Sequence, residues 1–312
     1  MNKTQSSPIV SVIVNSYNST KYIDSCIQSI LDQTFKDFEL IIVDCSNDDT
    51  FEKLLRYQDS RILLKKVDGR ISLSRARNIS LSIARGTYIA LMDADDICVN
   101  NRLEKQLEHL QLTNADVCGS WYYELDDASG SARKRRTVIT DRDIKALLSV
   151  YNPICNPTSF FKKDVLRPVP YREDYLYAED SEMWLELATR VNFTIAPFYL
   201  IYYRVHDEQL SRERVDAPMA WFNKARDKYL ETLLGSPSCI QKAALASRFR
   251  LGLTFLFKLN RKLNGISFRA SCEIYSRFQL KTPRILSPLR RMERFLIGFT
   301  MILVRTFHIR HL

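Results

Sequence analysis

The segment Gly86-Thr-Tyr-Ile-Ala-Leu-Met-Asp-Ala-Asp-Asp96 is a short apolar run that ends in three carboxylates, Asp93, Asp95 and Asp96. Its apolar half is typical of a buried strand. Carboxylates at the tip of such a strand repel one another and resist desolvation, and a hard divalent ion such as Mg2+ or Mn2+ neutralises them. Because side chains alternate along an extended chain, Asp93 and Asp95 are predicted to face one side and to hold one ion. An Asp-x-Asp motif alone is weak evidence, since it also caps helices and fills solvated turns.

The sequence around this segment alternates strands with amphipathic helices. Apolar strand runs are expected at residues 9–14, 40–43, 62–67 and 88–92, and helices at residues 23–31 and 73–84. This rhythm predicts an α/β, Rossmann-like fold with a mainly parallel sheet and right-handed crossovers. Ligands of such sheets bind beyond the carboxyl ends of the strands. Tyr17, Asp44 and Asp93 all follow strands and are therefore predicted to lie on one rim.

The glycine pattern argues against two common nucleotide-binding classes. The sequence contains neither G-x-G-x-x-G after the first strand nor G-x-x-x-x-G-K-[ST]. Dinucleotide-dependent dehydrogenases and P-loop enzymes depend on these loops for phosphate binding. Both classes are therefore poor interpretations of this chain.

Length and charge predict two regions. A chain of 312 residues is long for one domain, so we expect a catalytic domain at residues 1–215 and a helical, basic region at residues 216–312. The net charge of +10 is concentrated near the end, where residues 240–312 contain 15 Lys and Arg against two acids, Glu273 and Glu293. Such a region contacts phosphates, either on an anionic membrane surface or on nucleic acid.

An apolar run at residues 295–304 lies between Arg294 and Arg305. As a helix it would span roughly 15 Å, about half of a bilayer core, so it is not predicted to cross a membrane. Two interpretations stay open. The run is either an interfacial anchor on an anionic membrane, or a helix packed on the catalytic domain or on a second subunit of an oligomer.

Cysteine usage and the N-terminus predict a location. The seven cysteines include no C-x-x-C pair, which favours free thiols in a reducing compartment over disulfides or a zinc site. Residues 1–7 are polar and lack the apolar core of a signal peptide. The expected location is cytoplasmic, peripheral at the inner face of the cell membrane.

Two early segments end in side chains suited to a nucleotide. In Val10-Ser-Val-Ile-Val-Asn-Ser-Tyr-Asn18, Tyr17 is suited to stack on a base, although it is also an ordinary packing residue. In Phe38-Glu-Leu-Ile-Ile-Val-Asp44, the terminal Asp44 is suited to accept a hydrogen bond from a base or ribose, although aspartate also forms turns.

Two later segments add charges suited to a diphosphate and an acceptor. Ser74-Arg-Ala-Arg-Asn78 begins a helix with Arg77, for which Arg75 is a competing candidate, as a group that contacts the diphosphate or a carboxylate. Tyr177-Ala-Glu-Asp-Ser-Glu-Met-Trp184 begins an apolar helix with Glu179 and Asp180. The helix dipole alone also favours acids at that position.

With these motifs in order, followed by Tyr202-Tyr-Arg-Val-His206, the sequence closely resembles the family-2 glycosyltransferases with a GT-A fold, of the bacterial surface-polysaccharide type. The resemblance runs from about Pro8 to Ser211. It implies an inverting hexosyltransferase that moves a sugar from a nucleotide-sugar donor to an acceptor hydroxyl. The acceptor that it implies is a glycan or a polyprenyl-diphosphate-linked glycan.

The resemblance also implies roles for individual residues. Asp93 and Asp95 would bind a divalent ion, Mn2+ or Mg2+, clamped on the donor diphosphate. His206 matches a position that contacts metal or phosphate in related enzymes. The family's acid pair falls on Glu179 and Asp180, with Asp180 expected as the base that removes the hydroxyl proton.

The nucleotide and two rival functions stay open. UDP is the expected donor nucleotide, but Asp44-Cys-Ser-Asn-Asp-Asp49 departs from the family's usual acidic residue and glycine after the second strand. One rival is a catalytically silent, glycosyltransferase-like binding protein, against which the intact acid pairs argue. The other is a nucleic-acid-binding protein that uses the basic region, which lacks the aromatic pattern of known modules. No nucleic-acid partner is therefore expected.

Overall fold

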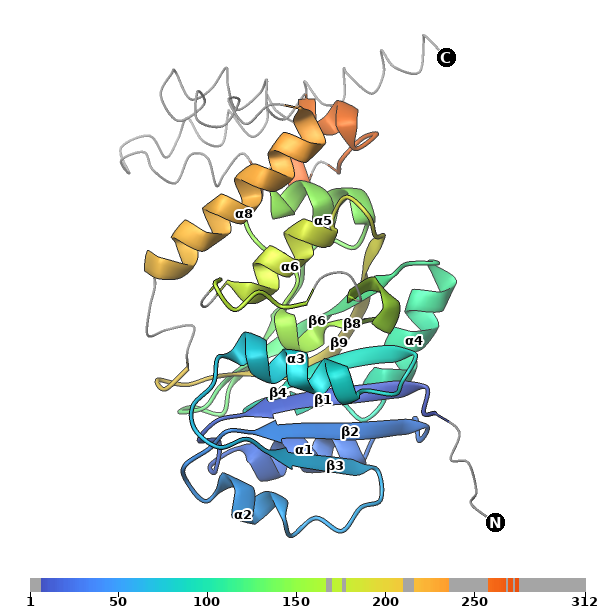
Figure 1. Ribbon diagram of the computed structural model, residues 1–312. Coiled ribbons are helices and arrows are strands. Elements are labelled where there is room, and N and C mark those ends of the chain that lie inside the picture. Colours follow the sequence, from blue (N-terminus) through green and yellow to red (C-terminus); the bar gives the residue numbers. More distant parts are fainter. Residues whose placement is uncertain are drawn as a thin grey trace. The chain divides into compact units, whose positions relative to one another are not determined.

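The computed structural model describes residues 7–166, 170–175, 178–209, 216–235, 258–267, 269–271 and 273–274 (Figure 1). The chain divides into two compact units, the first Met1–Ile139 with Ile154–Ala225 and the second Thr140–Pro153 with Arg226–Leu312. Helix α8 (Asp216–Leu234) begins at the boundary expected between residues 215 and 216, which stays a prediction. The apolar run at residues 295–304 and most of the basic region lie outside the described residues.

The first unit is built on one mixed sheet whose strand order is β3-β2-β1-β4-β8-β6-β9-β5, with β7 paired to β6. The predicted parallel part is confirmed, because β3, β2, β1 and β4 are parallel neighbours. Strand β8 is antiparallel to β4 and to β6, while β6 and β9 are parallel to each other. The strands span β1 Val10–Ser16, β2 Phe38–Asp44, β3 Ile62–Lys66, β4 Tyr88–Asp93, β5 Ile97–Cys98, β6 Val117–Asp126, β7 Ala132–Arg135, β8 Phe160–Lys162 and β9 Phe193–Val205.

Helices connect the strands, as the apolar spacing predicts. In α1, Ile23, Ile27 and Ile30 repeat at helical spacing and are buried. Helix α3 begins after Ser72, whose hydroxyl accepts a hydrogen bond from the backbone N–H of Arg75 and so caps the helix. The helices of the first unit include α1 Ile23–Leu31, α2 Thr50–Leu54, α3 Leu73–Ile83, α4 Arg102–Leu112 and α6 Glu179–Leu187, with 3-10 turns at Asn156–Thr158 and Lys163–Leu166.

The sheet buries both of its faces. Apolar residues of α1 and α4 pack with Phe160 of β8 on one face. The next residue, Phe161, points to the opposite face, where its ring meets Trp184 of α6 edge-on at 5.8 Å. Trp184 is fully buried and also contacts Phe193. It is therefore a core residue of the α6 side of the sheet, and it holds α6 against the strands.

A separate polar network lies at the amino ends of the parallel strands, opposite the predicted rim. Glu39 of β2 is buried and accepts hydrogen bonds from the Ser11 hydroxyl at 2.6 Å and from the backbone N–H of Arg85 at 2.7 Å. Gly86 donates its N–H to Ser11 Oγ at 2.8 Å. A Cβ on Gly86 would lie 2.5 Å from the Ser11 nitrogen, so only glycine lets the chain approach β1 this closely.

The second unit contains α5 (Asp141–Leu148), part of α8 and short helical segments from residue 258 onward. Three polar contacts join α5 and the residues beside it to that later part of the chain. The backbone N–H of Ser267 donates to Asp143, the Arg142 guanidinium donates to the carbonyl of Asn264, and the Tyr151 hydroxyl donates to Glu273. Residues 140–153 thus belong with the C-terminal half of the chain.

Candidate active site

The carboxyl ends of the parallel strands bring the predicted residues to one rim of the first unit. Strand pairing aligns Ser16 of β1 with Asp44 of β2, and Asn15 with Asp93 of β4. Tyr17 therefore lies just past β1, and Asp93 ends β4. Strands β6 and β9 run in the same direction as β4, so residues after β9 reach this rim as well.

His206 lies directly against the Asp-x-Asp segment. Its Nε2 atom is 2.9 Å from Oδ2 of Asp95. Its ring centroid is 4.8 Å from that of Tyr22 on the α1 side, and its Nδ1 atom is buried without a hydrogen-bond partner among the described residues. Two residues that lie 111 positions apart in the sequence therefore meet as an acid–imidazole pair.

The third acid of the segment is more buried than the other two. Asp96 is fully buried, its Oδ1 accepts the backbone N–H of Arg204 at 2.8 Å, and its Oδ2 has no partner in the described part of the chain. Burial, together with the charges of Asp95 and Asp93, raises the pKa of Asp96 well above its ordinary value. Asp96 therefore acts on the shape of the turn rather than facing a ligand.

Arg204 holds this turn in place, and sequence reasoning did not single it out. Its Nε donates to the carbonyl of Asp95 and its NH1 to Oδ1 of Asp127, both at 2.7 Å. Asp127 also accepts from Lys21 Nζ and Tyr22 OH, each at 2.8 Å, and these hydrogen bonds hold its pKa well below the usual range. The signal was available, because Arg204 stands two residues before His206 in the quoted motif.

A second group of charges approaches Asp93 from α3 and α6. NH1 of Arg77 lies 2.9 Å from Oε1 of Glu179, and both side chains are buried. Burial raises the pKa of Glu179 against the opposing effect of Arg77. The competing candidate Arg75 is exposed.

The two acid motifs are electrostatically joined at Asp93. Burial raises the pKa of Asp93 to about 7; Arg77 opposes the rise, and the carboxylates of Asp95, Asp180 and Glu179 add to it. The Asp180 carboxylate is half-buried and accepts the backbone N–H of Ser181 at 2.7 Å. The start of α6 and the Asp-x-Asp turn therefore form one acidic cluster.

The predicted nucleotide residues lie at the β1 and β2 end of the rim. Tyr17 is 39% exposed, with the Arg70 guanidinium 5.1 Å from its ring centroid. Asp44 is fully buried, and its carboxylate accepts hydrogen bonds from the side chains of Ser16, Ser46 and Lys66. A nucleotide can reach the Asp44 oxygens only after one of these contacts opens.

The donor set of the rim fits a divalent ion shared with a diphosphate. In the described part of the chain, no three His, Cys, Asp or Glu side chains are gathered as a complete metal site. Asp95 and His206 are already in contact, and carboxylate and imidazole suit Mn2+. Mg2+ and Mn2+ commonly take one or two protein ligands and complete their shell with phosphate oxygens.

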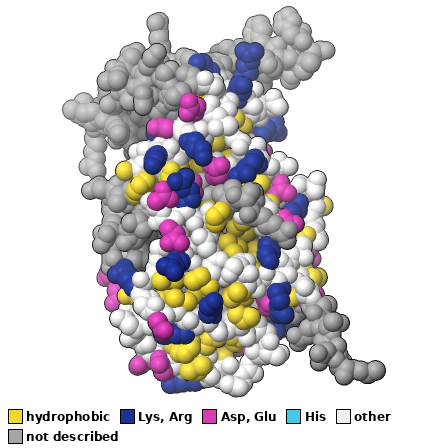
Figure 2. Space-filling model, viewed as in Figure 1, with side chains coloured by type: hydrophobic (Ala, Val, Ile, Leu, Met, Phe, Trp, Pro, Cys, Tyr) yellow, Lys and Arg dark blue, Asp and Glu magenta, His cyan; other side chains and the backbone are white. Residues whose placement is uncertain are grey.

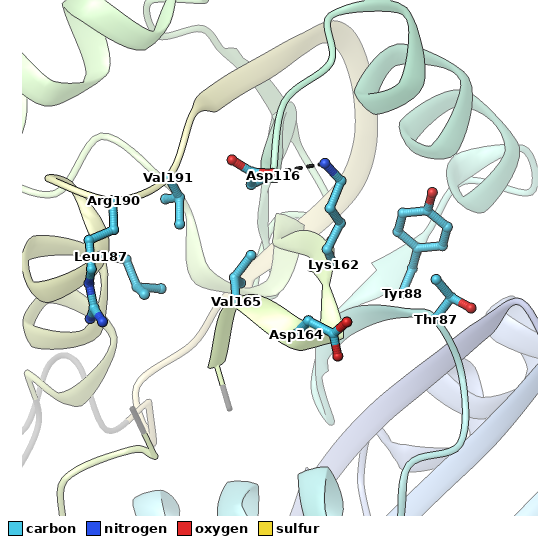
Figure 3. A pocket seen from close by; sticks show the side chains of 9 residues that line it. All are labelled: Thr87, Tyr88, Asp116, Lys162, Asp164, Val165, Leu187, Arg190 and Val191. Carbon is cyan, nitrogen blue, oxygen red and sulfur yellow. Dashed lines mark hydrogen bonds and ion pairs between the residues drawn. The ribbon is translucent and has the colours of Figure 1, made fainter. Parts of the chain in front are cut away.

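A hollow of about 550 Å³ lies at the opposite end of the strands (Figure 3). It is bounded by Tyr88, the first residue of β4, whereas Asp93 is the last. Its charged groups are paired, since Lys162 contacts Asp116 at 2.8 Å and Arg190 lies 3.7 Å from Glu186. The hollow is therefore separate from the acidic cluster. On the face seen in Figure 2, basic and acidic side chains are interspersed with apolar patches.

The comparisons with known proteins decide the family. The profile described as glycosyl transferase family 2 matches residues 11–169, about half of the chain, including the Asp-x-Asp segment. The chain belongs to glycosyl transferase family 2. The resemblance read from the motifs is confirmed, and with it the enzyme class, a glycosyltransferase.

Named relatives of this family-2 glycosyltransferase come from archaea and bacteria. An uncharacterised glycosyltransferase of Methanocaldococcus jannaschii is 33% identical over 215 residues, which is 66% of this chain and 74% of the relative. The Escherichia coli UDP-Glc:alpha-D-GlcNAc-diphosphoundecaprenol beta-1,3-glucosyltransferase WfaP is 29% identical over 209 residues, 66% of this chain and 81% of the relative.

A solved structure agrees on the fold. Staphylococcus aureus TarS, residues 1–349 in complex with UDP-GlcNAc, superposes with a TM-score of 0.61 and 18% identity over 91% of this chain and 79% of that chain. At this identity the likeness concerns the fold alone. The predicted GT-A architecture is confirmed as a mixed, mostly parallel sheet flanked by helices.

Proposed function

We propose that this glycosyltransferase transfers a sugar, with inversion, from a UDP-sugar to a hydroxyl of a glycan or lipid-linked glycan in surface polysaccharide synthesis. One observation carries the proposal. The ion pair of Arg77 with Glu179, at 2.9 Å, joins α3 to the start of α6, and the charges of Arg77, Asp180 and Glu179 all act on Asp93 of the Asp-x-Asp segment. A donor-binding group and an acceptor-activating group are thereby available at one rim.

Asp95 and His206 are the residues that would hold a divalent ion, with Asp93 beside them. When bound, such an ion stabilises the negative charge that develops on the leaving nucleoside diphosphate. Arg204 keeps Asp95 in reach by binding its carbonyl oxygen, and Asp127 in turn fixes the guanidinium of Arg204. These contacts orient the carboxylate before any ligand arrives.

Asp180 is the proposed base. Its carboxylate is half-buried at the start of α6, so one oxygen can accept the proton of an acceptor hydroxyl as the glycosidic bond forms. Glu179 is held by Arg77 and is thereby kept away from the proton transfer. The adjacent acids thus have different roles, in which Glu179 fixes the helix end and Asp180 does the chemistry.

The donor assignment rests on Tyr17, Asp44 and the relatives. Tyr17 offers an exposed ring for a base, and Asp44, paired with Lys66, ends the neighbouring strand β2. WfaP is named for a UDP-linked glucose and a diphosphoundecaprenol acceptor, and TarS was solved with UDP-GlcNAc. These names favour UDP and a polyprenyl-diphosphate-linked acceptor for this chain.

A peripheral position at the inner face of the cell membrane is part of the proposal. It is supported by the basic composition of residues 240–312 and by the lipid-linked acceptor in the name of WfaP. Among the helices of the described ranges, none combines the length and apolarity needed to cross a bilayer.

The decisive experiment measures transfer and hydrolysis of UDP-, dTDP- and GDP-sugars with Mn2+ and with EDTA. Asp95→Asn and Asp180→Asn are compared with the control variant Asp116→Asn. Asp116 is paired to Lys162 at the opposite end of the strands. We expect turnover with UDP-sugars that needs the metal. Both rim variants should lose it, and Asp180→Asn should still bind UDP. Metal-independent turnover, or full activity of either rim variant, would contradict the proposal.

A further inference from the structure

Three tyrosines form a stacked row on β6 and β9. The rings of Tyr123 and Tyr202 lie 4.7 Å apart at an interplanar angle of 14°, and those of Tyr123 and Tyr199 lie 4.9 Å apart. All three side chains are half-buried. We call Tyr202, Tyr123 and Tyr199 the tyrosine row.

The tyrosine row lies on the same face of the sheet as the proposed base. Tyr122 packs against the cluster formed with α1 and α4. Tyr122 and Tyr123 pair in regular register with Arg135 and Lys134 of β7, so the side chain of Tyr123 points to the opposite face. That face is the one on which Trp184 of α6 packs against Phe161, and α6 begins with Glu179 and Asp180.

One end of the row lies beside the acidic cluster. Tyr202 is the strand partner of Ile97, which directly follows Asp96. Two residues further along β9, Arg204 binds the carbonyl of Asp95. An acceptor whose hydroxyl lies at the rim can therefore extend over Tyr202 and Tyr123.

The other end of the row carries two cations. Lys134 Nζ lies 5.1 Å from the ring centroid of Tyr199, and the Arg136 guanidinium lies 5.6 Å from it and donates to the Tyr199 hydroxyl. Arg136 also lies 5.1 Å from the ring of Trp121. Aromatic rings hold these two positive charges in place at this end of the row, where the charges complement an anion.

We propose that the tyrosine row with Lys134 and Arg136 is the acceptor subsite, and that it binds an oligosaccharide carrying a phosphate several sugars away from the reacting hydroxyl. The inference rests on the proposed function and specifies its acceptor. Phenol hydroxyls suit sugar hydroxyls, and the two cations complement a phosphate. The cations lie at the Tyr199 end of the row and the acidic cluster lies at the Tyr202 end, so the phosphate would lie at the far end of the bound oligosaccharide from the reacting hydroxyl.

The test measures binding of neutral tetrasaccharides of glucose, galactose and N-acetylglucosamine, each with and without a reducing-end phosphate, by titration calorimetry. We expect the phosphorylated form of at least one sugar to bind about tenfold more tightly. Lys134→Ala with Arg136→Ala should abolish that preference. Arg133→Ala is the matched control for Lys134→Ala, because it removes the same charge from the same strand but on the opposite face.

Two further arms separate the possible failures. Tyr123→Phe with Tyr202→Phe should weaken neutral and phosphorylated ligands alike, by about threefold or more, and leave the preference for phosphate. UDP-sugar hydrolysis should stay unchanged in Arg133→Ala, which lies outside the proposed subsite. If the wild-type protein does not hydrolyse UDP-sugars, the proposed function is refuted. If it hydrolyses them but binds phosphorylated and neutral oligosaccharides equally well, this inference alone is refuted. The inference would also be overturned if the protein bound vesicles of anionic lipid through Lys134 but bound none of the oligosaccharides.

Discussion

The guanidinium of Arg77 on α3 lies 2.9 Å from the carboxylate of Glu179 at the start of α6, and both side chains are buried. The pair joins two helices whose sequences are about 100 residues apart, next to Asp93. Glu179 also sits at a helix N-terminus, where the dipole favours a negative charge. The ion pair therefore fixes the start of α6, which carries the proposed base Asp180.

Removal of one member of this pair should be costly. Arg77→Met leaves Glu179 buried without its partner, and we expect a loss of about 3 kcal/mol in the free energy of unfolding. The double variant Arg77→Met with Glu179→Leu removes both charges and should be more stable than the single variant. Urea denaturation measures both. Equal stabilities of the single and double variants would show that the buried charge is not the cause.

Arg204 is predicted to act through Asp95 rather than on the substrate. Arg204→Lys cannot reproduce the fork that binds the Asp95 carbonyl and Asp127 together. We expect the Mn2+ concentration for half-maximal activity to rise about 10-fold or more. Arg190→Lys, near the end of α6 and away from the rim, is the control. An unchanged Mn2+ requirement in Arg204→Lys would assign Arg204 to another task.

The residues of the rim could be predicted from the sequence, but the side-chain contacts that hold them in place could not. Parallel strands deliver their carboxyl ends to one edge, so Tyr17, Asp44 and Asp93 could be placed together from the sequence. The contact between Arg204 and Asp127 depends on the pairing of β6 with β9, which includes register shifts near Trp121. No local pattern encodes that pairing. The three-residue strand β8 is likewise too short to show a period.

Asp44 shows a second limit of sequence reasoning. The sequence places an acid at the end of a strand, which suits a nucleotide, and the structure confirms the position but surrounds the carboxylate with Ser16, Ser46 and Lys66. Lys66 comes from β3, and Ser16 from β1. The identity of these partners follows from the strand order, which the residues around Asp44 do not specify.

Glu39 should contribute to stability in a pH-dependent way. Burial opposes its ionisation, but hydrogen bonds from Ser11 and from the backbone and side chain of Arg85 outweigh it and lower the pKa. Its contribution is therefore complete above the unfolded-state pKa of about 4.3 and disappears as the pH falls through the lower folded-state value. Glu39→Gln should cost about 1 kcal/mol at pH 7 and progressively less below a pH of about 4.3. Urea titrations of both proteins across this range test it, and a cost that is constant with pH would contradict the assignment to charge.

Gly86 is the first residue of the segment that ends in Asp93, Asp95 and Asp96. It is predicted to be required for packing rather than for backbone conformation. A Cβ there would lie 2.5 Å from the Ser11 nitrogen and 2.8 Å from the Val10 carbonyl carbon, so β1 and the start of β4 would have to separate. We expect Gly86→Ala to cost about 3 kcal/mol in the free energy of unfolding.

Gly130 provides the matched comparison for this prediction. It has a φ of +67°, and no atom of the described residues lies within 4 Å of the position that a Cβ would take. Gly130→Ala should therefore cost only the strain of a left-handed alanine, about 1 kcal/mol. Urea denaturation of the two variants separates the mechanisms. If Gly86→Ala cost no more than Gly130→Ala, the two strands could move apart freely, and the close contact that aligns Asp93 with Asn15 of β1 would not be what holds the rim in register.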